Sequence, residues 1–519
     1  MKLNYKRTIF VGFAFFLICT FWQAYDTIIP KILTDKFGMN QANSGIIMAL
    51  DNVLALFMLP LFGAVSDKCK RKSGRRTPFI MAGTIAAAVL LIALSFVDNL
   101  QLKAISDVSA IDDPAAMERL WDAEKDETLQ TPENEEYILS RKYTREEFTA
   151  ITSQAENPET GKKETNGEYL SYVVPARQHY AQTVSRENPR NLIMFIAVLV
   201  LLLIAMAVFR SPAVALMPDV TIKPLRSKAN AVINLMGTAG GILVLGMGIV
   251  FATGSVKNTL MSYTVFFSIV AAVMLLSLLV FRRKVDEPRF VREMEEESRK
   301  YGIDAGADDS GSGSRKLSSA EFRSLLLILA SVVFWFMGYN AVTSKYSVYA
   351  GKVLSRDYNT TLLIANIAAI VSYLPVGMLA SKIGRKKTIL IGIAMLASAF
   401  GVAAFLRQGS PALLMNAMFA LAGVGWATIN VNSFPMVVEL SRGGDVGRYT
   451  GFYYTASMAA QTVTPYFSGL LMDNAGMTTL FPYAAVFVAL AAVTMLFVRH
   501  GDSRPIPAGS KLEQFAGGD

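Results

Sequence analysis

The chain has 519 residues, of which 52% are hydrophobic and 18% charged, and its formal net charge is +9. This composition is too apolar, and the chain too long, for a single soluble domain. The basic residues are concentrated in short loops between apolar runs, so the positive charge indicates the orientation of a membrane protein and argues against a nucleic-acid surface.

Twelve apolar runs follow one another along the chain, each near the ~20 residues that a helix needs to cross a bilayer. The first follows only seven residues and has no small-residue cleavage site after it, so we expect a retained helix and no signal peptide. The runs lie at 8–32, 42–65, 78–97, 191–218, 228–252, 260–281, 323–349, 359–380, 388–406, 411–438, 448–472 and 480–499.

The short loops between these runs alternate between basic and basic-poor. The basic set includes "KCKRKSGRR" (68–76), "FRRK" (281–284) and "SKIGRKK" (381–387). Cytoplasmic loops carry the excess of lysine and arginine in membrane proteins. The pattern therefore predicts a multi-pass protein of the plasma membrane, or of the inner membrane in a bacterium, with both termini in the cytoplasm.

Two polar segments interrupt the runs, and the second of them divides the runs six and six. Residues 98–190 are expected to form an extracellular insertion, in which "PAAMERLWDAEKDETL" and "TREEFTAITSQA" are typical of short amphipathic helices. Residues 283–322 are expected to form a cytoplasmic linker that begins with a charged helix, "EPRFVREMEEESRKYG". The insertion should be a peripheral cap. The remaining units are an N-terminal bundle with helices one to three (1–97) and four to six (191–282), a C-terminal bundle with helices seven to twelve (323–500) and a cytoplasmic tail (501–519).

The two halves repeat each other. "FWQAYDTIIPK" (21–31) is echoed by "FWFMGYNAVTSK" (334–345), so that Asp26 corresponds to Asn340. Asp51 and Asn366 also correspond, because each lies nine residues before a proline in the second helix of its half. Such repeats are typical of transporters in which two related bundles enclose one site. Only the first half carries the acids.

A loop motif in each half carries a family resemblance. "LPLFGAVSDKCKRKSGRRTPF" follows the second run and "LPVGMLASKIGRKKTIL" the eighth, and the fourth and tenth runs end in "MPDVTIKPLRSKAN" and "FPMVVELSRGGDVGRYT". The first loop resembles the G-x-x-x-D-[RK]-x-G-R-[RK] motif of the major facilitator superfamily. Its stretched form is similar to that of the sucrose/proton symporters and the glycoside–pentoside–hexuronide:cation symporter group.

The resemblance implies an all-α membrane protein with twelve transmembrane helices in two pseudo-symmetric six-helix bundles. It also implies a cytoplasmic gate of charged residues at helix ends, which controls conformational change. The second copy of the loop motif has Ser381 where the motif has aspartate. In addition, Ala55 and Leu59 occupy the places of the sodium-site aspartates of melibiose-type symporters. The implied gate residues are Gly63, Asp67, Lys68, Gly74, Arg75, Arg76, Asp219, Arg226, Glu439 and Arg448.

Three charged residues inside the runs are candidates for proton coupling: Asp26, Asp51 and Arg210. A charge at this depth costs about 2.5–3.5 kcal/mol on insertion scales. Consecutive antiparallel helices should bring the two acids to the same depth, and Arg210, near the midplane, needs an acid partner or a solvated cavity. Both histidines lie outside the runs, so a proton relay must use carboxylates. The alternative is that these groups only hydrogen-bond neighbouring helices.

Aromatic and amide residues inside the runs are candidates for binding a substrate. Trp22 and Trp335 could stack on a sugar ring or anchor the helices at the membrane surface. Amides could bind hydroxyl groups or join helices. Lys31 and Lys345 are expected to snorkel at the outer mouth. The full set is Trp22, Tyr25, Asp26, Arg210, Trp335, Asn340, Asn366, Asn430 and Gln461.

The sequence has no G-x-x-x-x-G-K-[ST] loop, no H-E-x-x-H motif and no cluster of Cys and His ligands. We therefore expect no metal, no cofactor and no enzymatic activity. The favoured function is a secondary active transporter, acting as a monomer in the lipid bilayer, that imports a sugar or glycoside with H+. An exporter or exchanger of a drug-like amphiphile or organic anion is the alternative, and a membrane receptor or scaffold using the insertion is a third reading.

Overall fold

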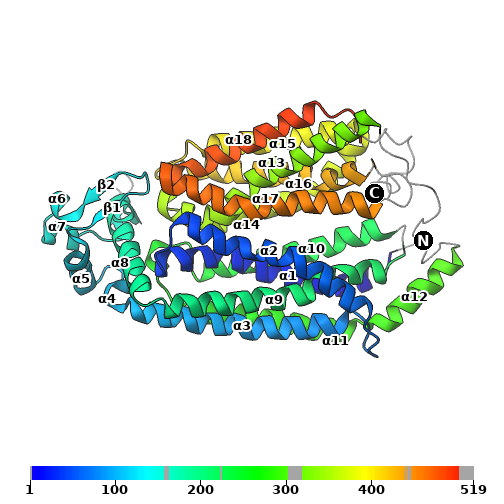
Figure 1. Cartoon of the computed structure of the whole chain (residues 1–519), viewed down its shortest axis with the longest axis horizontal. Coiled ribbons are helices and arrows are strands. Elements are labelled where there is room, and N and C mark those ends of the chain that lie inside the picture. The colour runs from blue at the N-terminus through cyan, green and yellow to red at the C-terminus, as the bar shows by residue number, and fades with distance from the viewer. Residues whose placement is uncertain are drawn as a thin grey trace.

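The computed structural model describes residues 3–156, 163–222, 225–301, 318–438, 440 and 446–501. Twelve long helices among these residues form two groups of six that lie side by side (Figure 1). The first group, the N-half, comprises α1 (Tyr5–Lys31), α2 (Gln41–Asp67), α3 (Thr77–Ala104), α9 (Arg190–Asp219), α10 (Arg226–Val250) and α11 (Thr264–Lys284). The second, the C-half, comprises α13 (Ser319–Tyr349), α14 (Tyr358–Ile383), α15 (Arg385–Ala403), α16 (Ala412–Val438), α17 (Val446–Ala475) and α18 (Leu480–Leu496). The predicted pair of six-helix bundles is confirmed.

Ten of the described helices are long and apolar enough to cross a membrane. α14 and α17 are not among these ten. The sequence of α17 is rich in hydroxyl and amide side chains, which suits a helix that packs against the other half better than one facing lipid. It packs along α2 of the N-half, and α14 packs on α10 in the same way.

Polar side chains begin several of these helices by accepting backbone N–H groups that have no partner within the helix. Asn40 caps α2 by accepting from the N–H of Asn43 at 2.9 Å. Ser318 caps α13 in a capping box with Glu321. Asp357 accepts from the N–H groups of Asn359 and Thr360 at the start of α14.

Each half has its own apolar core. Phe21, Phe195 and Phe209 are fully buried in the N-half, and Trp335 and Phe481 in the C-half. Each first helix continues past its expected end as a π-helical turn, Ile32–Lys36 after α1 and Ala350–Leu354 after α13. The structural repeat therefore extends beyond the sequence repeat.

The third helix is longer than the span expected from the sequence. α3 continues to Ala104 because Asp98 lies inside the bundle, where it pairs with Lys36. Both side chains are 0% exposed, and the Nζ–Oδ2 distance is 2.7 Å. Gln101 adds a hydrogen bond to the carbonyl oxygen of Lys36 at 2.9 Å. A polar sequence continues the helix here because its charge has a buried partner.

Residues 105–189, here called the outer domain, fold into a separate unit at one end of the bundles (Figure 1). The core of this unit includes Leu139, Phe148 and Tyr169. The two expected helices are present but short, since each gives way to a strand of a two-stranded antiparallel sheet. The elements are α4 (Ser106–Ser109), α5 (Pro114–Glu124), β1 (Thr128–Gln130), β2 (Glu136–Ile138), α6 (Leu139–Lys142), α7 (Arg145–Thr149), β3 (Gln154–Glu156), β4 (Lys163–Thr165) and α8 (Val174–Glu187).

An ion pair inside the outer domain should make its stability depend on pH. His179 Nδ1 lies 2.6 Å from Glu124 Oε2, and this hydrogen bond raises the pKa of His179 above its ordinary value. The stabilisation should be fully present below the pKa of an unfolded histidine, about 6.5, and lost as the pH rises through the raised value.

Thermal unfolding reported by Trp121 fluorescence, with the other tryptophans replaced by phenylalanine, tests this expectation. The midpoint should fall as the pH is raised from acidic to alkaline. His179→Gln can still donate to Glu124 but cannot titrate, so it should remove the dependence. An unchanged pH profile in this variant would contradict the role of the pair.

The expected linker helix is present as α12 (Glu287–Lys300), at the end of the molecule opposite the outer domain (Figure 1). Phe290 and Val291 pack against the core of the N-half. Arg7 lies over the Phe290 ring at 4.9 Å and pairs with Glu293 at 3.2 Å. α12 therefore belongs structurally to the N-half. We refer to the two ends of the molecule as the outer-domain end and the α12 end.

Candidate functional site

Three charged residues that the sequence places inside the helices come together on the N-half. Asp26 of α1 interacts electrostatically with Asp51 of α2 and with Arg210 of α9. Asp51 also interacts with Arg210, and it accepts a hydrogen bond from Asn52 Nδ2 at 2.7 Å. All three side chains are partly exposed. The cluster has two acids and one base, so it carries one uncompensated negative charge when both acids are ionised.

Aromatic rings surround this cluster. The Arg210 guanidinium carbon lies 5.2 Å from the centre of the Trp22 ring, within the range of a cation–π contact. Trp22 packs edge-on against Tyr25 at 5.3 Å. Trp22 and Asp26 are four residues apart on α1, so one helical turn places both on the same face. Trp22 Nε1 has no hydrogen-bond partner among the described residues.

The C-half faces the cluster with aromatic rings and hydroxyl groups. Tyr339 of α13 interacts electrostatically with Asp26 and with Tyr373 of α14. Its ring is stacked on Trp426 of α16, with centroids 3.7 Å apart and an interplanar angle of 4°. Tyr373 in turn hydrogen-bonds to Asn430, which is exposed. Each half therefore contributes residues to the candidate site.

Sequence reasoning missed Tyr339, Tyr373 and Trp426. The signal for Tyr339 was present, because the residue precedes Asn340 as Tyr25 precedes Asp26. Trp426 and Tyr373 have no counterpart in the repeated segment, and single aromatic residues within apolar runs are too common to single out.

Trp335 does not line this site, which corrects the expectation that it offers a face to a sugar. It is 0% exposed and packs in the C-half core. The physical reason is the spacing: five residues separate Trp335 from Asn340, whereas four separate Trp22 from Asp26. At 3.6 residues per turn, the additional residue rotates Trp335 away from the face that carries Asn340.

The predicted amides are placed differently from one another. Asn340 Nδ2 donates to the Phe336 carbonyl oxygen at 2.8 Å, and Gln461 Nε2 donates to that of Ser457 at 3.3 Å, so both bond to their own helices. Asn366 is partly buried on α14. Asn430 is the predicted amide that joins the described aromatic wall, through Tyr373.

Lys31 and Lys345 do not snorkel, contrary to expectation. They are 5% and 0% exposed. Lys31 Nζ donates to the Thr253 carbonyl oxygen at 2.7 Å, and Lys345 Nζ donates to that of Gln41 at 2.5 Å. The second bond joins the C-half to the N-half.

Backbone contacts join the halves tightly at the outer-domain end. Asp473 of α17 accepts the N–H groups of Gln41 and Ala42, at 2.8 and 2.7 Å, at the start of α2. Gly45 approaches Pro465 so closely that an added Cβ would lie 2.1 Å from the Pro465 carbonyl oxygen. A Cβ on Gly469 would lie 2.3 Å from the Gln41 carbonyl oxygen. α2 and α17 are therefore in backbone contact here.

The related pair α10 and α14 meets at the same end. Thr253, which follows α10, hydrogen-bonds through its hydroxyl group to Tyr358 at 2.7 Å and accepts from Asn359 Nδ2 at 2.9 Å. Both contacts cross from the N-half to the C-half. The outer-domain end is thus closed around the pseudo-symmetry axis by two related helix pairs.

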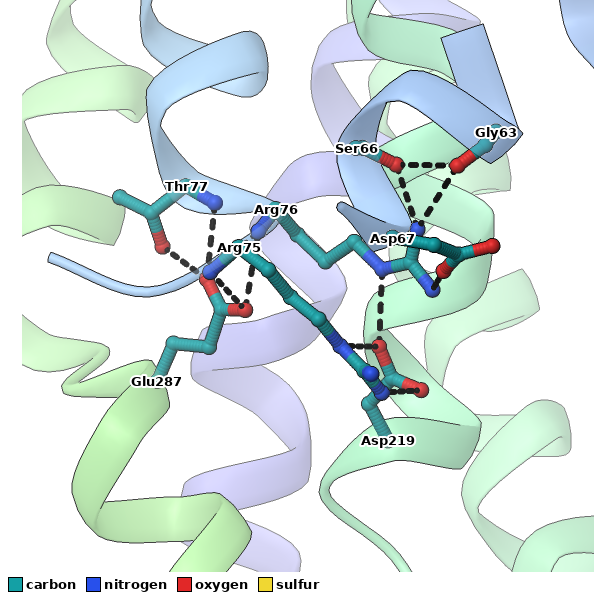
Figure 2. A network of polar contacts seen from close by, with 8 residues as sticks. All are labelled: Gly63, Ser66, Asp67, Arg75, Arg76, Thr77, Asp219 and Glu287. Atoms are coloured by element: carbon teal, nitrogen blue, oxygen red, sulfur yellow. Dashed lines mark hydrogen bonds and ion pairs between the residues drawn. The ribbon is translucent and has the colours of Figure 1, made fainter. Parts of the chain in front are cut away.

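The α12 end carries a network that includes the predicted gate residues (Figure 2). Arg76 Nε lies 2.8 Å from Asp219 Oδ2, and Arg75 pairs with the other oxygen of Asp219 at 2.7 Å. Arg76 also forms an ion pair with Asp67 and hydrogen bonds with Ser66 and the Gly63 carbonyl oxygen. The network joins α2, α3 and α9 within the N-half.

The remaining predicted gate residues contribute less or are not described. Lys68 is exposed. Glu439 and the side chains of Arg226 and Arg448 lie outside the described residues. Gly74 has a φ of +107°, a backbone conformation that favours glycine. A Cβ at this position would lie 2.2 Å from a carboxylate oxygen of Glu287.

Glu287, at the start of α12, is a network residue that sequence reasoning missed (Figure 2). Its carboxylate accepts the N–H groups of Arg75 and Arg76 at 2.9 Å and that of Thr77 at 2.8 Å, together with the Thr77 hydroxyl group. A carboxylate at a helix N-terminus is stabilised by the N–H groups and by the helix dipole. Glu287 therefore caps α3 and fixes the backbone of the two predicted gate arginines.

Glu287→Gln should lower the free energy of unfolding by about 2 kcal/mol, because a buried charged acceptor of several N–H groups is lost. Thermal unfolding in detergent measures the effect as a lower midpoint. Glu296→Gln is the matched control, since Glu296 is an exposed acid on the same helix. Equal midpoints for the two variants would contradict the capping role.

Among the described residues, no group of three or more His, Cys, Asp or Glu side chains could hold a metal ion. The charged cluster and the rings beside it offer carboxylates, a guanidinium group, hydroxyl groups and aromatic faces. This set can bind a polar organic solute and exchange a proton.

Comparisons with known proteins bear on the family and the fold. A family model described as "MFS/sugar transport protein" matches residues 10–105, and one described as "Major Facilitator Superfamily" matches residues 353–516. A comparison with curated proteins found no sequence match. The two family models thus match one segment in each half.

Solved structures share the fold over nearly the whole chain. The xylose transporter XylE from E. coli, in an inward open conformation, matches with a TM-score of 0.59 at 15% identity, covering 99% of each chain. A D-xylose-proton symporter matches with a TM-score of 0.54 at 16% identity, covering 96% of this chain and 99% of that one. A mutant of the nucleoside transporter NupG matches at 0.50 and 14% identity, covering 96% of this chain and 100% of that one.

The fold and the family models indicate a multi-pass membrane transporter. With matching family models in both halves, the chain belongs to the major facilitator superfamily.

Proposed function

We propose that this protein imports a sugar or glycoside together with a proton, by alternating access to a site between its two halves. The observation that carries the proposal is the charged cluster of Asp26, Asp51 and Arg210 opposite the aromatic and hydroxyl wall of the C-half. The name of the family model matching the first half and the names of two solved structures, a xylose transporter and a D-xylose-proton symporter, support the same class of substrate.

The C-half wall supplies groups that suit an uncharged, hydroxyl-rich ring. The stacked pair Tyr339 and Trp426 offers a flat apolar surface, against which the C–H face of a sugar can pack. Tyr373 and Asn430 offer hydrogen-bond donors and acceptors for hydroxyl groups. Trp22, Tyr25, Asn340, Asn366 and Gln461 remain proposed contacts that other conformations would bring closer to the substrate.

Asp26 is the proposed coupling acid, and Asp51 and Arg210 are its partners. With one negative charge in excess, the cluster becomes neutral when it takes up one proton. A neutral cluster crosses between the two access states at lower cost than a charged one, because exposing charge to an apolar surrounding is unfavourable. Proton binding and substrate passage would be coupled through this charge balance.

Alternating closure of the two ends of the molecule would complete the transport cycle. The contacts of Gly45 and Gly469 close the outer-domain end in the conformation described, while the network of Asp67, Arg75, Arg76 and Asp219 would act at the α12 end. We propose that the α12 end and both termini face the cytoplasm and that the protein lies in the plasma membrane as a monomer. Both walls of the site come from one chain, which supports a monomeric transporter.

Exchange or export of an organic anion is the second candidate. It is favoured by Arg210, which is partly exposed and lies beside the Trp22 ring. This arrangement suits a carboxylate attached to an apolar body. The proton cluster would then serve to compensate the charge of the substrate.

Uptake by proteoliposomes separates the two candidates. The panel would contain monosaccharides, glycosides and aromatic carboxylates, each with and without an imposed pH gradient. The proposal expects accumulation of a sugar or glycoside only when the outer-domain side is acidic. Flux of carboxylates alone would establish the second candidate, and sugar flux unaffected by a pH gradient would overturn proton coupling.

A further inference from the structure

The outer domain contacts both halves, but through different kinds of interaction. On the N-half it is continuous with α3 and α9 and shares apolar clusters with it: Val256 belongs to the core of the domain, and Leu260 packs with Ile105 and Ala181. Neither cluster includes a described C-half residue. The domain must therefore move with the N-half as one body.

Polar contacts, by contrast, attach the domain to the C-half at three separate places. In the loop between β1 and β2, the Pro132 carbonyl oxygen accepts the N–H of Met477 at 2.7 Å, and Asn134 Nδ2 donates to the Asn474 carbonyl oxygen at 2.7 Å. These bonds hold the connection between α17 and α18.

A second attachment lies at the end of β4. Gln408, in the connection between α15 and α16, donates to the Thr165 carbonyl oxygen at 2.5 Å. Gly167 lies beside the same side chain, since a Cβ on it would lie 2.8 Å from Gln408 Oε1.

The third attachment is a bridge through α8. Gln178 donates to Asp35 of the N-half at 2.7 Å and accepts from Lys352 of the C-half at 2.9 Å. One side chain of the outer domain thus links the π-helical turns that end the first helices of both halves.

We propose that the outer domain is a brace that holds the outer-domain end closed and releases the C-half each time that end opens. The reason is the asymmetry of its contacts. Apolar burial is hard to undo in a stable fold, whereas exposed or partly exposed hydrogen bonds can exchange with water. The inference rests on the alternating access of the proposed function, but on neither its substrate nor its coupling ion.

The brace sets how often the end opens. Each attachment joins a residue of the outer domain to the C-half, so all three must separate when the C-half moves away from the N-half at this end. Weakening the attachments should raise the population of molecules open at this end, and a covalent link there should abolish it.

Spin labels measure this opening without a substrate. Cysteines at Lys257 of the N-half and Ala475 of the C-half, both exposed, would carry the labels after Cys19 and Cys69 are replaced by serine. In the variant Asn134→Ala/Gln408→Ala, the ratio of long to short distances should rise about tenfold, as expected when two hydrogen bonds are lost. Ser140→Ala is the matched control, because Ser140 bonds to Asp126 within the domain.

A cross-link tests the opposite direction. In the same background without spin labels, Gly167→Cys/Gln408→Cys should form a disulfide on oxidation and reduce solute flux at least about tenfold. A reductant should restore it. Asp126→Cys/Ser140→Cys, linked inside the domain, should leave flux unchanged on oxidation.

Distance distributions that are the same in the Asn134→Ala/Gln408→Ala variant and its parent would overturn the brace, as would full flux through the cross-linked protein. If the distances respond but no sugar is transported by any variant, the brace holds and the proposed substrate is wrong. If sugar is transported but the distances do not respond, the proposed function holds and the brace is wrong.

Discussion

Asp26→Asn is expected to abolish accumulation of the substrate against a gradient while leaving its binding intact. The amide keeps the shape and most of the hydrogen-bonding capacity of the acid but cannot titrate. The substitution also makes the first half resemble the second, in which Asn340 occupies the corresponding place. Without a titrating group, the charge of the cluster no longer changes with the proton gradient, so downhill exchange should persist without accumulation.

Uptake and equilibrium binding, measured on the same preparation, test this result. Asn340→Ala should do the converse, weakening binding by about 1–3 kcal/mol while sparing coupling. Asp51→Asn serves as the comparison within the cluster. If Asp26→Asn still concentrates substrate in response to a pH gradient, Asp51 becomes the candidate for the coupling acid.

Gly45→Ala is expected to hold the outer-domain end open and to slow transport at least about tenfold, because one end can no longer close. The new Cβ would lie 2.1 Å from the Pro465 carbonyl oxygen, closer than non-bonded atoms approach. The obstructing atom belongs to the backbone of α17, so no side chain can rotate away. The two helices must separate instead, and the close packing of the halves there is lost.

The spin-label pair at Lys257 and Ala475 measures the separation directly. Gly246→Ala is the matched control, since the same methyl group on α10 would meet no atom within 4 Å. Gly469→Ala should reproduce the effect from the other helix, where the Cβ would lie 2.3 Å from the Gln41 carbonyl oxygen. Normal transport with an unchanged distance distribution in Gly45→Ala would show that this end does not close as described.

The helices and the acidic cluster were predictable from the sequence. Apolar length identifies a membrane helix, and a charge within it is rare enough to attract attention. Asp26, Asp51 and Arg210 were therefore found from sequence, and they interact electrostatically in the structure. The depth of each could be counted from the ends of its helix.

Helix rotation was harder to predict than depth. Trp335 was expected beside the substrate because its segment resembles that of Trp22, yet one additional residue before Asn340 turns it into the core. Burial of lysine was likewise missed at Lys36 and Lys345, because their partners are Asp98 and a backbone carbonyl oxygen distant in the sequence. Glu287 was missed for the same reason, because it caps α3 from another helix and such a contact leaves no pattern in the sequence around α3.

Side chains of the C-half bind the start of α2 through the backbone groups of α2. Asp473 accepts hydrogen bonds from the N–H groups of Gln41 and Ala42, and Lys345 donates one to the carbonyl oxygen of Gln41. Every amino acid except proline presents the same two groups at position 41. These three hydrogen bonds therefore do not depend on the side chain of residue 41, which is 4% exposed and constrained only by the packing around it, whereas they require the side chains at positions 345 and 473.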